Sequence, residues 1–310
     1  MSDTPDLRDL IIEVEAPDRG LVTVEGPDAL SFLQSLVSQD LGEIAIGAGA
    51  HTLLLTPQGK LDVDARAVRV GDDRLWLETE PGFGAQLAAS LQRFRIRVKA
   101  DIVDASAGFG ALAVRGPGAG RLRPLVAPPA VAVDVPWPFG DAFDVIGPRD
   151  VVEASRVALR DAGATAARPE ELEQLRVEAG VPRQGADLDD RTIAQEAFLE
   201  RDAVSFTKGC FLGQELVCRI DTRGHVNRFL RSVRVLDGAR PPVGAEVVVD
   251  GKAVGALTSV TPLIDRPWSG LAFVRREVEP PLDAVLRWDG GETRARVEAT
   301  PASLATSPAS

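Results

Sequence analysis

The sequence predicts an α+β fold that ends in a small β-barrel. Three segments each read as a strand, a Gly-Pro turn and a helix, and such units mixed with hairpins are typical of α+β domains of ferredoxin-like type. After about residue 229 the pattern changes to short strands joined by Asp-Gly turns, which is typical of a barrel. At 310 residues the chain can bury a substantial core in two or three domains.

The three strand–turn–helix units share one arrangement. A glycine follows the strand, and a proline stands near the first turn of the helix, where a missing N–H is tolerated. The turns are Gly26-Pro27, Gly116-Pro117 and Gly147-Pro148. We expect helices at residues 27–37 and 148–162, and only a short helix after Pro117.

The C-terminal segment has the pattern of antiparallel strands. Residues 230–236 alternate basic and apolar side chains, as in a half-exposed strand. Asp-Gly turns at residues 250–251 and 289–291 each join two β-prone runs and predict hairpins. We therefore assign residues 229–300 to a small β-barrel. Residues 301–310 hold only Ala, Ser, Thr, Pro and Leu, and we expect a disordered tail there.

Residues 1–228 form the larger α+β region. Prolines gather around residues 124–138 and read as a connection between domains. We expect two subdomains in this region, with boundaries near residue 45 and at residues 124–142.

Composition and charge limit the partners and the location of the chain. A net charge of -11 opposes broad binding to nucleic acid, whose phosphates require a basic face. No apolar run is long enough to span a membrane. The first residues lack the basic and apolar regions of a signal peptide, and the two cysteines fit a reducing compartment. We therefore expect a cytoplasmic protein without membrane or nucleic-acid partners.

The octapeptide Lys208-Gly209-Cys210-Phe211-Leu212-Gly213-Gln214-Glu215 is the most informative stretch. It follows a β-prone run at residues 204–207 and opens a predicted helix. The glycines on each side free the backbone to present the thiol of Cys210, while Lys208 and the positive end of the helix both favour thiolate. The alternative is that Cys210 is a buried small hydrophobe beside a tight turn.

This octapeptide, with Arg219 and Arg223-Gly224 after it, resembles the K-G-C-Y-x-G-Q-E signature of the YgfZ family. Phe211 stands where the family usually has tyrosine, so a role for a phenolic hydroxyl is not expected. Looser similarity covers nearly the whole chain. Its landmarks are residues 22–34, 55–60, 175–182 and 195–197.

Members of the YgfZ family are folate-binding proteins related to the aminomethyltransferase (T-protein) of the glycine cleavage system, and they support assembly or repair of iron–sulfur clusters. The resemblance therefore implies a central folate cleft formed by the α+β domains, with tetrahydrofolate or a derivative as the cofactor. It also implies iron–sulfur enzymes or their assembly proteins as partners.

Two functions from different classes follow from this resemblance. The first is an accessory protein that binds tetrahydrofolate and uses Cys210, beside Lys208, in maintaining iron–sulfur enzymes, without conventional turnover. The alternative is a folate-dependent aminomethyl or methyl transferase like the T-proteins, whose family pattern lacks the octapeptide. A third possibility is a folate-binding module without chemistry. We favour the first.

Glu178 is the leading candidate for contact with the pterin ring. Residues 169–179 read as a helix, and Glu178 lies at the edge of its apolar face. In the last turn the helix dipole disfavours a carboxylate by roughly 0.3–1 kcal/mol, so Glu178 needs a donor. The similar glutamate of the aminomethyltransferases holds the pterin ring. The alternative is a solvated carboxylate paired with Arg176 or another arginine.

Asp64 is the second carboxylate of interest. Residues 58–64 read as a hairpin turn and strand, with Asp62 and Asp64 on one side. The aminomethyltransferases carry a catalytic aspartate in a comparable segment, which Asp64 matches more closely than Asp62. A register slip of one residue would reverse the face, and a solvent-facing strand edge is the alternative. The resemblance also implies that Gln214, Glu215 and Arg223 contribute to folate binding, Arg223 at the anionic glutamate tail.

A stable metal centre is not expected. Closed zinc and cluster sites use four ligands, often in Cys-x-x-Cys pairs. Only Cys210, Cys218, His51 and His225 could contribute thiols and imidazoles. The predicted helix begins after Cys210, so the two thiols would not share a helix face.

Overall fold

The computed structural model describes residues 6–16, 18–264 and 266–301, and the chain forms two compact units. The first unit contains the chain up to Pro169 together with Glu200–Cys218. The second contains Glu170–Leu199 and the chain from Arg219 onward. The predicted boundaries near residue 45 and at 124–142 stay a prediction.

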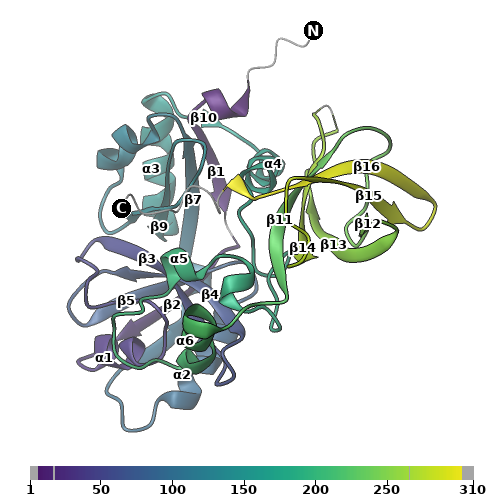
Figure 1. Cartoon of the computed structure of the whole chain (residues 1–310). Helices are drawn as coiled ribbons and strands as arrows, with labels where there is room; N and C mark the ends of the chain where they lie inside the picture. The colour runs from purple at the N-terminus through teal and green to yellow at the C-terminus, as the bar shows by residue number, and fades with distance from the viewer. Residues whose placement is uncertain (1–5, 17, 265, 302–310) are drawn as a thin grey trace. The chain divides into compact units, whose positions relative to one another are not determined.

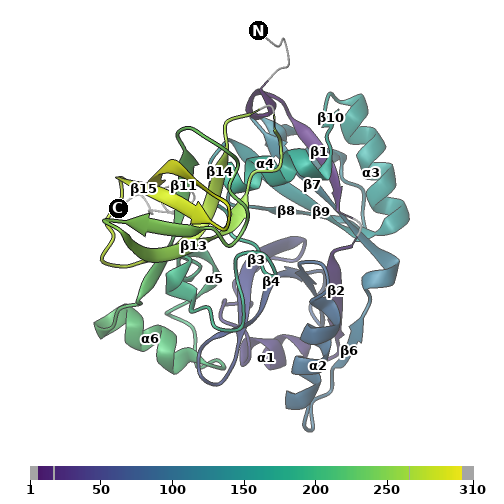
Figure 2. The same cartoon turned by 90° about the vertical axis from the view of Figure 1, so that its right-hand side faces the viewer.

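One five-stranded antiparallel sheet of the first unit has the order β3-β4-β5-β2-β6. Its strands are β2 (Gly20–Glu25), β3 (Ala48–Leu55), β4 (Leu61–Arg69), β5 (Arg74–Thr79) and β6 (Asp101–Asp104). Helices α1 (Ala29–Gln34) and α2 (Gly84–Phe94) cover one face, as Figure 2 shows, and their leucines join the core with the inward residues of the strands. Apolar side chains alternate with polar ones along β4, as a half-buried strand requires.

The other sheet of the first unit has the order β10-β1-β7-β9-β8, with β1 and β10 parallel and the other pairs antiparallel. Its strands are β1 (Ile12–Ala16), β7 (Phe109–Gly116), β8 (Val131–Asp134), β9 (Asp141–Pro148) and β10 (Thr165–Ala166). Helix α3 (Arg149–Asp161) lies along β7 and β9 (Figure 1). The proline-rich stretch 124–138 therefore contains a strand of this sheet, β8.

In each of the three predicted units a strand leads into a helix, but two details differ. Helix α1 is shorter than the predicted 27–37, and β9 continues through Gly147 to Pro148, so no separate turn precedes α3. Strand β2 leads into α1, and β9 leads into α3. Strand β7 leads into a short 3-10 helix at Ala119–Leu125, and Pro124 inside it is incompatible with a continuing α-helix. Further 3-10 turns lie at Leu7–Asp9, Ser106–Gly108 and Ala194–Glu196.

The second unit combines helix α4 (Pro169–Ala179) with a closed six-stranded barrel of order β11-β14-β13-β12-β15-β16. The strands are β11 (Arg228–Val235), β12 (Glu246–Val249), β13 (Lys252–Val260), β14 (Ser269–Arg275), β15 (Leu282–Trp288) and β16 (Gly291–Glu298). Asp250 and Gly251 both have positive φ, as a two-residue hairpin turn requires. The predicted α+β class and the C-terminal barrel are thus confirmed, and α4 has the predicted bounds.

The predicted strand at residues 204–207 is wrong. These residues are irregular and lie between α5 (Glu200–Ala203) and α6 (Gln214–Arg223). The Ser205 N–H donates to the Ser38 carbonyl (3.0 Å), and the Ser205 hydroxyl accepts from the Lys208 N–H (3.2 Å). These contacts satisfy the backbone without a partner strand, so the β-branched residues here do not form a ladder.

Two further expectations meet the limits of the described residues. The predicted disordered tail lies outside them from residue 302 onward. The central folate cleft stays a prediction. In the described part of the chain, no helix is both long enough and apolar enough to cross a membrane.

Candidate functional site

The Lys208–Glu215 loop packs against the turn at residues 55–60, so two motifs far apart in the sequence are in contact within the first unit. Gly213 has a φ of +76°, and a Cβ there would lie 2.4 Å from a backbone carbonyl oxygen of that turn. Gly59, also at +76°, would place a Cβ 2.5 Å from the Cβ of Leu216. A side chain at either position would force the segments apart, so the close approach requires both glycines.

Lys208 is buried and points into the protein, with 8% of its surface exposed. Its ammonium donates hydrogen bonds to the carbonyl oxygens of Val37 (2.8 Å) and Gln39 (2.7 Å). Burial lowers the pKa of Lys208 to about 8, and the nearby carboxylate of Asp40 opposes this shift. Lys208 therefore anchors the loop to residues 37–39, and among the described contacts none joins its ammonium to Cys210.

The two cysteines differ in exposure. Cys210 is exposed, whereas Cys218 is half-buried within α6. Helix α6 begins at Gln214, after Cys210, as predicted. Across the described residues, no group of three or more His, Cys, Asp and Glu side chains is arranged to hold a metal ion.

The remaining candidates of α6 take different positions along the helix. The Gln214 side chain accepts a hydrogen bond through Oε1 from the Phe211 N–H (3.3 Å), which closes the loop on itself. Glu215 lies exposed in the first turn of α6, and Arg223 lies exposed at its last residue.

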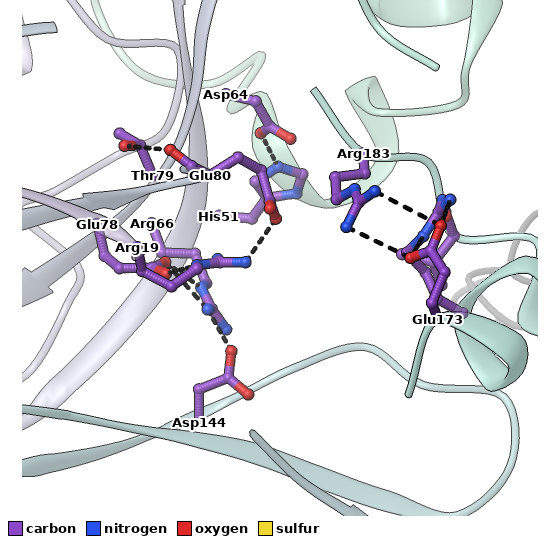
Figure 3. Close-up of polar contacts among 12 residues, drawn as sticks. Arg19, His51, Asp64, Arg66, Glu78, Thr79, Glu80, Asp144, Glu173 and Arg183 are labelled. Atoms are coloured by element: carbon purple, nitrogen blue, oxygen red, sulfur yellow. Dashed lines mark hydrogen bonds and ion pairs between the residues drawn. The ribbon is translucent and has the colours of Figure 1, made fainter. Parts of the chain in front are cut away.

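Asp64 lies on β4, an interior strand of its sheet, and faces His51 on the neighbouring strand β3. His51 Nε2 is 2.5 Å from Asp64 Oδ1, and His51 Nδ1 is 3.2 Å from Asp202 Oδ2 on α5. Figure 3 shows the Asp64–His51 contact. Burial lowers the pKa of His51, but the two carboxylates outweigh burial and raise this pKa to about 10. Asp64 is therefore part of an aspartate–histidine–aspartate cluster rather than a sheet edge facing solvent.

A separate ionic network joins the two sheets of the first unit (Figure 3). Arg66 on β4 pairs with Glu78 on β5 (3.0 Å) and with Asp144 on β9. Arg115 on β7 also pairs with Asp144 (2.7 Å). Burial would raise the pKa of Asp144, but Arg115 and Arg66 outweigh burial and hold that pKa well below its usual range. Because both arginines already pair with carboxylates, we assign this network to stability.

Glu178 is half-buried in the last turn of α4, within the second unit. The fully buried Gln174, one turn earlier, donates from Nε2 to Glu178 Oε1 (2.6 Å). The Leu263 N–H donates to Gln174 Oε1 (3.2 Å), so the amide has a defined orientation. This is the donor that a carboxylate at a helix C-terminus needs.

Arg176 has other partners and does not neutralise Glu178 in the way considered above. It pairs with Glu173 (2.8 Å) and Asp187 (2.8 Å), and it donates to the Ser259 hydroxyl of β13 (2.8 Å). Arg183 also pairs with Glu173, at 3.4 Å, and dashed lines join these two residues in Figure 3. The cluster connects α4 to the barrel within the second unit.

Three residues of the candidate sites were not found from the sequence. His51 drew attention only as a possible metal ligand, although it is one of two histidines. Gln174 could have been found, because residues four apart share a helix face. Asp202 left no local signal, since its partner lies 151 positions away.

Two hollows of about 390 and 400 Å³ occur in the first unit. Asp28, Phe32 and Phe94 help line one, and Asp72 and Arg74 help line the other. Neither contains a predicted site residue, so the candidate site rests on side-chain contacts and not on these hollows.

Comparison with known proteins finds YgfZ proteins and aminomethyltransferases among the relatives of this chain. Residues 12–128 match the family model of the GCVT N-terminal domain. The chain is 27% identical to the tRNA-modifying protein YgfZ of Klebsiella pneumoniae over 93% of this chain and 91% of that protein. It is 26% identical to an aminomethyltransferase of Thermus thermophilus over 86% of this chain and 80% of that protein.

The fold has a matching solved structure. The glycine cleavage system aminomethyltransferase T of Bartonella henselae superposes with a TM-score of 0.80 over 95% of this chain and 87% of that protein, at 19% identity. Together with the octapeptide around Cys210, these similarities identify the family. The chain belongs to the YgfZ family, which is related to the aminomethyltransferase T-proteins.

Proposed function

We propose that this protein binds a reduced folate and supports the assembly or repair of iron–sulfur clusters. The observation that carries the proposal is an exposed thiol on a fixed loop. Cys210 is exposed, while Lys208 and Gly213 on either side are held by close contacts with residues 37–39 and with the 55–60 turn. A loop anchored on both sides can present a reactive group in one place without burying it.

Glu178 is the proposed contact for the pterin ring. A carboxylate suits the adjacent N–H groups of a reduced pterin, because its two oxygens can accept a pair of hydrogen bonds. Gln174 already orients Oε1 of Glu178. We propose Asp64 as a second folate contact and Arg223, exposed at the end of α6, as the partner of the anionic glutamate tail.

Calorimetry with 5-formyltetrahydrofolate tests the folate proposal. The wild-type protein should bind, and Glu178→Gln should weaken binding by about 1–3 kcal/mol, the scale for loss of a charged hydrogen-bonding partner. Glu170→Gln is the matched control, because Glu170 is an exposed glutamate of the same helix. Equal affinity of wild type and Glu178→Gln would remove Glu178 from the site.

Genetic complementation tests the iron–sulfur proposal. Deletion of the gene should lower the activity of iron–sulfur enzymes, and the wild-type gene should restore it. Cys210→Ser should fail to restore activity, whereas Cys218→Ser should succeed because Cys218 is half-buried in α6. Restoration by Cys210→Ser would exclude the thiol from the function.

The transferase alternative has one favourable observation, which is the similarity to aminomethyltransferases in sequence and fold. It predicts formation of 5,10-methylenetetrahydrofolate when the protein meets an aminomethyl donor and tetrahydrofolate. An accessory protein would bind tetrahydrofolate under the same conditions and form no such product.

The Klebsiella relative is named for tRNA modification. With a net charge of -11, this chain is poorly suited to hold the phosphate backbone of an RNA. We propose that any link to tRNA passes through a client enzyme. A gel-shift assay with tRNA should therefore show no binding by this protein alone.

A further inference from the structure

The His51 cluster draws its members from three separate elements of the first unit. His51 comes from β3, Asp64 from β4 and Asp202 from the short helix α5. One ring nitrogen of His51 lies 2.5 Å from an Asp64 oxygen, and the other lies 3.2 Å from an Asp202 oxygen. Both nitrogens therefore face carboxylates.

This geometry identifies the protonation state of the ring. A neutral imidazole carries one N–H, so it can donate to only one of two carboxylates, whereas the imidazolium carries two. Burial disfavours the imidazolium, but Asp64 and Asp202 outweigh burial and raise the pKa of His51 to about 10. With both nitrogens donating, His51 has no lone pair for a metal ion and no tendency to release its proton at neutral pH.

The helix that supplies Asp202 is itself held by hydrogen bonds to residues 38 and 39. The Ser38 hydroxyl donates to the Ala203 carbonyl (2.6 Å), and the Gln39 amide donates to the Asp202 carbonyl (2.7 Å). Residues 37–39 also hold the ammonium of Lys208. One short segment therefore supports both Asp202 and the loop that carries Cys210.

We infer that His51 and Asp202 are positioning residues that hold Asp64 in one orientation as a permanent hydrogen-bond acceptor for the N–H groups of a reduced pterin. The inference rests on the proposed folate function. It assigns to Asp64 a binding role, because a carboxylate already accepting from an imidazolium is poorly placed to remove a proton from the ligand. His51 acts through Asp64 and does not itself touch the folate.

A double-mutant cycle on the binding of 5-formyltetrahydrofolate tests whether His51 acts through Asp64. His51→Gln should weaken binding about tenfold, or about 1.4 kcal/mol. In an Asp64→Asn background, the same His51 substitution should change the affinity by less than about twofold, because the group it orients is already altered. A full tenfold loss in both backgrounds would overturn the positioning role. His225→Gln, at the exposed second histidine, serves as the matched control.

Nitrogen-15 NMR of the histidine side chains gives a readout that is independent of the ligand. At pH 7.5 both ring nitrogens of His51 should carry protons in the wild type, and the exposed His225 supplies the reference signal. Asp202→Asn, which keeps an acceptor but removes the charge, should make His51 lose its proton at a lower pH. A neutral His51 ring in the wild type at pH 7.5 would overturn the inference. Absence of folate binding by the wild type would instead refute the proposed function, and the NMR signature would still decide the state of the cluster.

Discussion

His51, Lys208 and Glu178 are charged side chains that the fold surrounds with oriented polar groups. Two carboxylates face His51, two backbone carbonyls accept from Lys208, and one buried amide donates to Glu178. Each set of partners offsets part of the free-energy cost of removing a charge from water. These partners make the behaviour of His51 and Lys208 with pH predictable.

The histidine cluster should stabilise the folded protein most at low pH. The pKa of His51 rises from 6.5 to about 10 on folding, because the two carboxylates outweigh burial. Its contribution is therefore fully present below pH 6.5 and is lost as pH rises through 10. We expect His51→Gln to lower the free energy of unfolding by about 1–3 kcal/mol at pH 6, and by progressively less toward pH 10. Urea unfolding across this range measures the difference, and a difference independent of pH would contradict the cluster.

Lys208 should show the opposite dependence. Burial lowers its pKa from 10.5 to about 8, against the attraction of Asp40. Between these values the unfolded chain binds more protons, so stability relative to a Lys208→Met variant should rise from pH 8 to 10.5. At all pH values the variant loses a donor to the Val37 and Gln39 carbonyls, which costs about 1–3 kcal/mol. Lys252→Met, at an exposed lysine, should leave the unfolding curve unchanged.

At the scale of elements, the loop between α5 and α6 combines an exposed thiol with a rigid frame. Cys210 lies in the irregular segment and is exposed, whereas Cys218 is half-buried within α6. Iodoacetamide should therefore alkylate Cys210 faster than Cys218 in the folded protein. Peptide mass spectrometry over time measures both rates, and unfolding in urea should bring the rates together. Faster labelling of Cys218 would favour a loop that buries its cysteine.

The two glycines of the octapeptide should respond differently to alanine. At Gly213 the φ is +76° and the new Cβ would lie 2.4 Å from a backbone oxygen, so we expect a loss of about 1–3 kcal/mol in stability. At Gly209 no atom lies within 4 Å of the new Cβ, so Gly209→Ala should be nearly neutral. Thermal unfolding of both variants makes the comparison. Equal effects would mean that the loop does not pack on the 55–60 turn.

At the scale of the whole molecule, each unit is assembled from two stretches of chain. In the second unit, Arg176 of α4 connects the first stretch to the barrel through Ser259, and Asp187 shares this cluster. Truncation of Arg176 to leucine leaves the buried Asp187 carboxylate with one cation fewer, which costs about 3–5 kcal/mol.

Arg183→Leu is the matched comparison for Arg176→Leu. Arg183 also pairs with Glu173, but its side chain is 40% exposed, so its loss should cost less than about 1 kcal/mol. Chemical unfolding monitored by tryptophan fluorescence distinguishes the two variants. Similar losses would show that the Arg176 cluster does not join helix α4 to the barrel.

Local signals in the sequence determined a large part of this structure. Helix α4 begins with a proline, carries glutamates in its first turn and ends before Gly180, so its bounds follow from its own residues. The Asp250-Gly251 hairpin likewise follows from two residues that tolerate positive φ. The start of α6 after Cys210 and the α+β class with a C-terminal barrel were readable for the same reason.

Only the tertiary structure decided which groups these elements bring together. The run 204–207 has β-prone residues, yet no strand forms there. The Ser205 N–H donates to the carbonyl of the distant Ser38 and not to a neighbouring strand. Lys208 reads as a cation beside a thiol, but residues 37–39 bind its ammonium. Asp64 could be read as a carboxylate at a solvent-facing strand edge, but it contacts His51, whose other ring nitrogen contacts Asp202. Propensity and periodicity are properties of neighbouring residues, whereas burial and hydrogen-bond partners depend on segments that meet only when the chain is folded.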